Sequence, residues 1–200
     1  MTYELKQNAK AIVKDNLLLC MCIAIINFIL NKLPNFYTHF VGGELSILDV
    51  LIIPFAILIV YCTLNVGICN FFINLNTESN PGLSDLMFGF NNMFKIVVVA
   101  LLSGLISILG CFLFLVPGII LAYMYSQVFY LIIENPDISV IDCLKESARI
   151  MKGHKMELFL LHLSFIGWLI LSFLTFGIAN LYVFPYYQAT LANFYLEIKG

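Results

Sequence analysis

The sequence has too few charged residues to cover the surface of a soluble protein. They make up 11% of its 200 residues, whereas soluble domains average about 25%. Charges are also absent from three long stretches, residues 50–77, 96–133 and 158–196. One bilayer crossing needs about 20 apolar residues, so each of the last two stretches suits two crossings joined by a tight turn. The composition therefore indicates an integral membrane protein.

The sequence also lacks the motifs of common enzyme classes. It contains no phosphate-binding P-loop, no nucleophile elbow, no zinc-protease helix motif and no dinucleotide fingerprint. Its six cysteines show no CxxC spacing and favour small packing residues over a disulfide framework or a metal site. We therefore expect no enzymatic activity, no catalytic or metal-binding residue and no cofactor. The net charge of −2 argues against a nucleic-acid partner.

The apolar stretches predict an all-α protein, a polytopic helical membrane bundle of about six transmembrane helices. The predicted crossings are residues 17–30, 52–73, 96–115, 117–133, 157–176 and 178–195. Pro117-Gly118 and Gly177 mark the tight turns, because these residues end helices or accept unusual backbone angles. The fourth crossing has a second interpretation, since Ser126 and Gln127 could mark a re-entrant segment.

The cations fall on one side of this predicted membrane arrangement. With six crossings, every Lys and Arg except Lys32 lies on the same side as the two termini. Cytoplasmic loops carry an excess of Lys and Arg, so we expect both termini to be cytoplasmic. An odd number of crossings would destroy this partition. No cleavable signal sequence is indicated, because nothing after Leu30 resembles a small-residue cleavage site.

The sequence also contains internal similarity that predicts three repeats. Asn80-Pro81 reappears as Asn135-Pro136, and the Pro117-Gly118-Ile119 turn is echoed by Phe176-Gly177-Ile178. We interpret the chain as a single integral membrane domain, residues 1–200, of three parallel units. Each unit would be a cytoplasmic amphipathic helix followed by a membrane hairpin. The approximate units are residues 4–75, 80–134 and 135–198.

The clearest amphipathic helix is predicted to begin at Ser139, which forms a capping box with Asp142. One face of it is predicted to carry Ile141, Leu144, Ala148 and Met151. This helix would either lie at the membrane interface, with its cations near anionic lipid, or pack against its own bundle. The residues expected to contact lipid or a partner are Lys145, Arg149, Lys152, His154 and Lys155.

Several polar side chains lie within the predicted crossings. His162 is the sharpest candidate, because ionisable residues inside a membrane are costly and often functional. It is either a proton-responsive or substrate-contacting group, or a neutral imidazole hydrogen-bonded to a neighbouring helix, for example to Asn180. Buried amides likewise either line a solute path or join helices, and Tyr186 and Tyr187 could face a lumen. The residues predicted for a path or polar core are His162, Asn180, Gln188, Asn65 and Tyr186.

The carboxyl half of the chain also resembles a known family. The signals are Asn135-Pro136, Met151-Lys152-Gly153-His154-Lys155, the run from Leu163 to Trp168, and Pro185-Tyr186. LKQNAKAIVKDN near the amino end fits the same pattern, so that the whole chain resembles the bacterial integral membrane family called domain of unknown function 975. More distantly, it is similar to the membrane region of some glycerophosphodiester phosphodiesterases. The resemblance implies a multi-pass protein of a bacterial plasma membrane, without an established activity.

Two functions are compatible with these features. The first is a transport-associated protein, a subunit or accessory for peptide or lipid export or for resistance to membrane-active peptides. It would contact membrane lipids and require a partner ATPase or an ion gradient. The second is a structural or regulatory scaffold that binds lipid or a partner membrane protein through its cytoplasmic helices.

Overall fold

The computed structural model describes residues 2–40, 47–77, 81–113 and 115–199, and within these residues the chain forms helices and turns without a β-strand. This confirms the predicted all-α class. In chain order the elements are α1 (Thr2–Asp15), α2 (Leu17–Phe40), α3 (Ile47–Asn76), the 3-10 helix η1 (Leu83–Asn92), α4 (Met93–Leu113), α5 (Leu115–Met124), α6 (Val128–Glu134), α7 (Val140–Ile150), α8 (Lys155–Ser164), α9 (Ile166–Leu174) and α10 (Asn180–Lys199).

Four segments are long and apolar enough to cross a membrane, and they agree with the second to fifth predicted crossings. They are Ile52–Asn76, Leu83–Phe112, Val116–Glu134 and Lys155–Leu174. α1 and α2 are long and apolar enough only when they are taken together, and the two helices are bent by 98° relative to each other. α10, which contains the sixth predicted crossing, is not among these segments, since it carries several amides and ends near Glu197 and Lys199. The described residues thus support four or five membrane-compatible helices.

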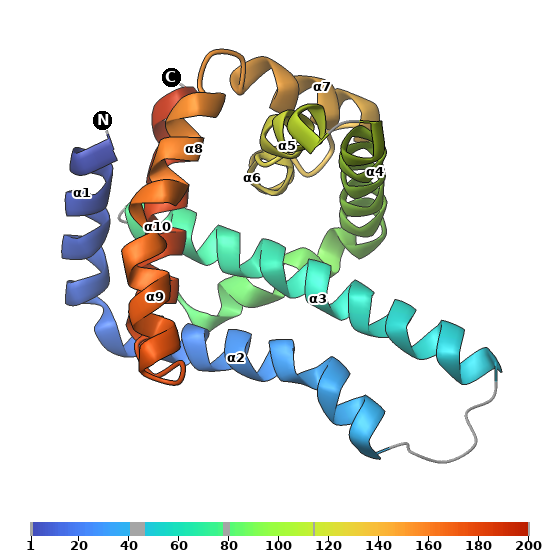
Figure 1. Ribbon diagram of the computed structural model, residues 1–200, viewed down its shortest axis with the longest axis horizontal. Helices are drawn as coiled ribbons and strands as arrows, with labels where there is room; N and C mark the ends of the chain where they lie inside the picture. The colour runs from blue at the N-terminus through green and yellow to red at the C-terminus, as the bar shows by residue number, and fades with distance from the viewer. Residues whose placement is uncertain (1, 41–46, 78–80, 114, 200) are drawn as a thin grey trace.

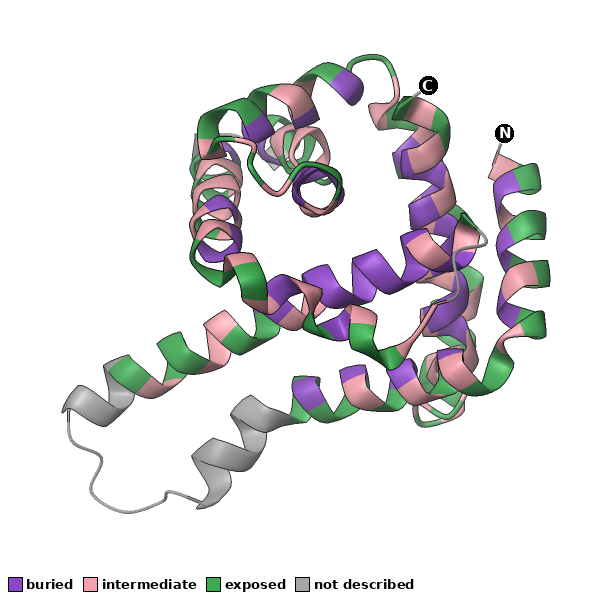
Figure 2. Cartoon of the chain, turned by 180° about the vertical axis from the view of Figure 1, so that it is seen from behind, coloured by how far each residue is buried: buried purple, intermediate pink, exposed green. Residues whose placement is uncertain are grey.

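These segments keep most of their apolar side chains on the outside. In the apolar stretch of each segment, only 17% to 33% of the residues are buried. α9 buries none of its residues. Phe112 of α4 and Phe173 of α9 are 91% and 85% exposed, and exposed residues line the outer faces of many helices in Figure 2. A soluble protein rarely exposes so much apolar surface, whereas lipid tails accept it without penalty.

The helices run in several directions instead of forming one parallel bundle (Figure 1). α3 crosses the molecule, with α8, α9 and α10 near one of its ends and α4 beside its middle, and α7 runs between α4 and α8. α1 packs along α10 and buries Leu5, Ala9 and Val13. The three-unit repeat stays a prediction, and residue 80, where its second unit would begin, lies outside the described residues.

The core is centred on the second half of α3, where Phe71 is fully buried. η1 packs against this part of α3 through two glycines. A Cβ atom at Gly67 would lie 2.2 Å from the carbonyl oxygen of Leu86, and one at Gly89 would lie 2.2 Å from that of Thr63. Any larger residue at either position would force the two helices apart.

The turn residues behave in two different ways. Gly177 has a φ of 87° between α9 and α10, which confirms the predicted turn there, because glycine accepts this conformation without strain. Pro117 and Gly118 instead lie inside α5, which begins at Leu115. Proline is tolerated in the first turn of a helix, and Gly118 allows close contact with Cys111 of α4.

α7 begins as predicted, and its buried face agrees with the predicted one only in part. The hydroxyl of Ser139 accepts a hydrogen bond from the Asp142 amide at 3.1 Å, which confirms the cap. The predicted apolar face is confirmed at Leu144 and Met151, which are buried, and is wrong at Ile141, which is 61% exposed. The reason lies in the break between α5 and α6. Ser147 donates to the Met124 carbonyl oxygen at 2.9 Å, and the Cys143 thiol lies 3.5 Å from that of Val128. The buried residues of α7 are Cys143, Leu144, Ser147 and Ile150.

α7 therefore has the intramolecular contacts of the packed alternative. Its neighbours are α4 and α6. Ser147 faces the end of α5, where the carbonyl group of Met124 needs a donor from outside its own helix. The cations of α7 are left on its outer side, where Lys145 and Arg149 are exposed.

Candidate functional site

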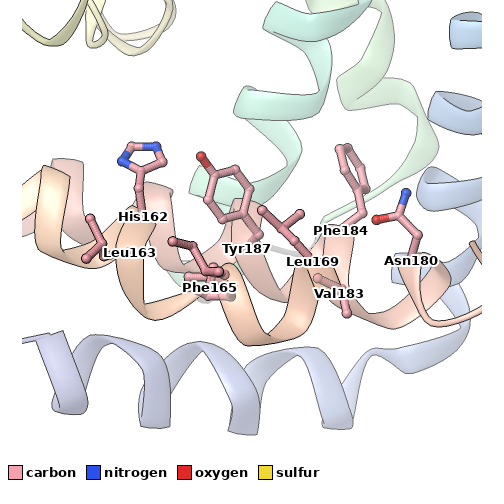
Figure 3. Close-up of a pocket in the computed structure, with 9 residues that line it drawn as sticks. His162, Leu163, Phe165, Leu169, Asn180, Val183, Phe184 and Tyr187 are labelled. Atoms are coloured by element: carbon pink, nitrogen blue, oxygen red, sulfur yellow. The ribbon is translucent and has the colours of Figure 1, made fainter. Parts of the chain in front are cut away.

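An apolar cavity of about 440 Å³ opens between the α8–α9 segment and α10. Among its lining residues, only His162, Asn180 and Tyr187 carry polar side-chain groups. Figure 3 shows His162, Tyr187, Phe184 and Asn180 projecting to the same side of the helices that carry them. The apolar lining consists of Leu163, Phe165, Ile166, Leu169, Val183 and Phe184.

The imidazole of His162 is held by its own helix. Its Nδ1 lies 2.7 Å from the carbonyl oxygen of Leu158. A carbonyl only accepts, so Nδ1 carries the hydrogen, and the neutral ring then has Nε2 as an acceptor. The rings of Tyr123 and Tyr187 lie 5.5 and 5.7 Å from the imidazole, centroid to centroid. The hydrogen bond therefore does not reach Asn180 or another helix, and Nε2 can accept a donor from a ligand.

Phe165 forms part of the cavity wall at the break between α8 and α9. The Lys6 ammonium donates to the carbonyl oxygen and to the hydroxyl of Ser164, both at 3.1 Å, and lies 4.4 Å from the Phe165 ring centroid. A cation is favourable beside the carbonyl end of α8. The Phe165 ring also contacts the rings of Tyr186 and Tyr187, with centroid distances of 5.1 and 5.2 Å. α1 thus helps to position the cavity wall.

The cavity brings together two of the five residues predicted for a path or polar core, His162 and Asn180. Tyr186 lies elsewhere, against Phe165 and Trp168, and its neighbour Tyr187 lines the cavity. Gln188 is half-buried and is not a lining residue.

Asn65, the remaining predicted path residue, lies on α3 and donates to the Tyr61 carbonyl oxygen at 2.7 Å. Sequence reasoning missed Lys6, although Lys6, Lys10 and Lys14 recur every four residues and so signal a common helix face.

The five cations predicted to contact lipid or a partner do not form one cluster. Arg149 is bound by Glu146 through three contacts, of which the shortest are Nη2 to Oε1 at 2.6 Å and Nε to Oε2 at 2.8 Å. These hydrogen bonds and the guanidinium charge lower the pKa of the Glu146 carboxyl group. Lys145 and Lys152 are exposed and have no ion pair within the described part of the chain.

The other two predicted cations lie around the start of α8. His154 Nδ1 lies 2.7 Å from Oε2 of Glu157, and Lys155 is partly exposed. Across the described ranges, no group of three or more His, Cys, Asp or Glu side chains could hold a metal ion. His154 and Glu157 therefore form a pair and do not belong to a larger set of ligands.

Residues 112–200 match the family described as Protein of unknown function (DUF975). The DUF975 region includes α5 to α10, and so holds every residue that lines the cavity and all the cations of α7. The match confirms the resemblance for this region and does not extend over the earlier helices. No curated protein and no solved structure matches the sequence.

Proposed function

We propose that the protein is a transport-associated membrane protein that holds a lipid-like ligand between α8–α9 and α10. The observation that carries this proposal is the cavity lining, in which His162, Asn180 and Tyr187 are surrounded by apolar side chains and no Lys, Arg, Asp or Glu is present. Ligand sites of this composition suit an apolar body with a few polar groups. A charged ligand would lose its hydration there without gaining a partner.

The exposure of the lining residues favours entry from the bilayer. Leu163, Ile166 and Leu169 are exposed at the outer surface, so the cavity opens onto the same apolar face that α9 would present to lipid. Once inside, a hydroxyl or amide group of the ligand could donate to Nε2 of His162 and bond the amide of Asn180. The lipid or peptide export and resistance roles both require such an amphiphilic ligand.

Photochemical labelling would test this assignment. Proteoliposomes are prepared with an uncharged long-chain alcohol that carries a diazirine on its alkyl chain, irradiated, and analysed by peptide mapping. We expect labels at Val183 and Tyr187 that decrease in a Leu169→Trp variant, because the larger ring fills the cavity mouth. Labelling of Phe112, on the exposed face of α4, serves as the control and should not change. Equal labelling of Val183 in both proteins would contradict the proposal.

Transport itself requires a separate measurement. If the cavity lies on a transport path, His162→Leu and Asn180→Leu should abolish flux of the lipid-like ligand in proteoliposomes. Asn65→Leu, which lies outside the cavity, should not. Unchanged flux in folded cavity variants would reject these residues as path-lining. The sequence carries no nucleotide-binding motif, so the energy would come from a partner ATPase or an ion gradient.

We further propose a bacterial plasma membrane location with both termini in the cytoplasm. The partition of Lys and Arg supports this only if α2 and α10 cross the membrane in addition to the four segments that meet the length and composition criteria. Epitope tags at the two ends should both resist protease in intact spheroplasts and become accessible after permeabilisation. A tag that is cleaved in intact spheroplasts would overturn the six-crossing topology.

A second candidate function is a scaffold that binds a partner membrane protein. Lys145 and Lys152 favour it, since both are exposed on the surface and unpaired within the described ranges. Native mass spectrometry of protein released from nanodiscs of its own membrane lipids should then show a stoichiometric protein partner that is lost in a Lys145→Gln/Lys152→Gln variant. Wild-type protein without any protein partner would count against this function.

A further inference from the structure

A second site lies along α1, separate from the cavity. It is a groove of about 540 Å³ that shares no lining residue with the cavity. Most of the groove comes from α1, and Tyr186 of α10 completes it. Its polar lining consists of Tyr3, Lys6, Gln7, Lys10, Lys14 and Tyr186.

The three lysines of this groove share one stripe of α1 because they are spaced at intervals of four residues. The neighbouring stripe, Leu5, Ala9 and Val13, is buried and fixes the rotation of the helix. No acidic residue lines the groove. Like charges four residues apart repel one another, so the stripe is unfavourable by itself and becomes favourable when an anion binds.

The lysines differ in how much of their binding capacity is already used. Lys6 donates to the carbonyl oxygen and hydroxyl of Ser164, which fixes its ammonium group and leaves one of its three donors. Lys10 and Lys14 are exposed. Neither makes a hydrogen bond or ion pair with any residue that the structure describes. The groove therefore has one anchored cation and two available ones.

The surroundings of the groove are apolar and membrane-compatible. α1 packs along α10 and contacts α8, which belongs to the candidate crossing Lys155–Leu174. Exposed cations beside a membrane surface attract anionic lipid headgroups. Immediately after the bend between α1 and α2, Leu18 is 76% exposed and Leu17 is also exposed. A ligand that joins an anion to alkyl chains would satisfy both surfaces.

We propose that the α1 groove binds the phosphate of an anionic phospholipid, with its acyl chains against the exposed apolar residues at the start of α2. The argument rests on charge complementarity between the lysine stripe and a phosphate, together with the adjacent apolar surface. It does not depend on a ligand in the cavity. The site would attach α1 to a lipid and hold the bent α1–α2 pair at the membrane.

The test uses the full-length protein in phosphatidylcholine nanodiscs that contain increasing fractions of phosphatidylglycerol. Native mass spectrometry counts the retained lipids, and titration gives the affinity. We expect one phosphatidylglycerol to be retained in preference to phosphatidylcholine, with about 30-fold weaker binding in Lys10→Gln/Lys14→Gln. Lys6 is left intact because it also holds Ser164. The matched control, Lys145→Gln/Lys152→Gln, removes the same charge from α7 and should bind like the wild type.

Three outcomes would overturn the proposal. Equal retention of phosphatidylcholine would show that the groove does not select an anion. Equal weakening in the two double variants would assign the attraction to net charge and not to the groove. Displacement of the lipid by an equal concentration of inorganic phosphate would show an anion site without a lipid requirement. Circular dichroism of each variant establishes that the helices are retained. Loss of lipid binding at the groove should not change the photolabelling of the cavity, so the two proposals can fail independently of each other.

Discussion

The Lys6 ammonium group and the Ser164 carbonyl oxygen lie 3.1 Å apart, although 158 positions separate these residues in the sequence. Their hydrogen bond joins the first helix to the break between α8 and α9. The Ser164 carbonyl group is the last of α8 and receives no amide donor from its own helix, and the lysine supplies both a donor and a positive charge. Phe165, which follows this break, is thereby held against α10 as a wall of the cavity.

Removal of this contact should loosen the attachment of α1. We expect Lys6→Met to lower the free energy of unfolding by about 1 kcal/mol, because hydrogen bonds from a charged donor are lost at a partly exposed position. Lys10→Met, on the same helix and without a hydrogen-bonding partner in the described residues, should have a much smaller effect. Thermal unfolding in detergent, followed by circular dichroism, compares the two. Similar melting temperatures for both variants would contradict the proposed role of Lys6.

The contact between α4 and α5 depends on a glycine. A Cβ atom at Gly118 would lie 2.4 Å from the amide nitrogen of Cys111, whereas one at Gly104 would have no neighbour within 4 Å. Gly118→Ala should therefore destabilise the protein by about 1–3 kcal/mol through overpacking. Gly104→Ala should be neutral or stabilising, because alanine favours a helix. Melting temperatures of the two variants are compared in the same detergent. Equal values would contradict the close contact between α4 and α5 at Gly118.

The ion pair between Glu146 and Arg149 should make a small contribution to stability that depends on pH. Because the pKa of Glu146 is lowered by Arg149, the contribution is present above the unfolded-state pKa of glutamate and is lost as the pH falls through the lowered folded-state pKa. The wild type should exceed Glu146→Gln in melting temperature at pH 7, and the difference should vanish in acid. A difference that grew on acidification would contradict this sign. The pair is exposed, so its effect should also decrease in salt.

Two cysteines should differ in their reaction with a maleimide. Burial raises the pKa of the Cys143 thiol to about 11, so that at pH 8 it is almost entirely in the unreactive thiol form. Cys111 is exposed at the end of α4. In detergent, Cys111 should be labelled before Cys143, and both should react after denaturation in dodecyl sulfate. Peptide mapping at successive times gives the order, and early labelling of Cys143 would show that α7 does not pack as described.

Much of the helical arrangement follows from local sequence signals. The four membrane-compatible segments were predictable because long uncharged runs cannot form a wetted surface. The Ser139 cap and the Gly177 turn were predictable because each depends on residues close together in the chain. The pairing of His162 with Asn180 in one cavity was anticipated only in part, since each was recognised as a polar residue in an apolar run. Their common cavity required the packing of α10 against α8–α9.

Other features depend on contacts between distant segments. The buried face of α7 was predicted only in part, at Leu144 and Met151. Hydrophobic periodicity takes no account of the carbonyl groups of Met124 and Val128, which Ser147 and Cys143 meet at the α5–α6 break. The partner of Lys6 was not predictable for the same reason.

The sequence by itself determined that the chain is helical and apolar enough for a membrane, because these properties reside in composition and in residues near one another. Only the tertiary structure decided which polar groups meet, that Tyr187 and not Tyr186 lines the cavity, and that α1 lies along α10. Those choices depend on how helices far apart in the chain pack and satisfy one another's unpaired backbone groups.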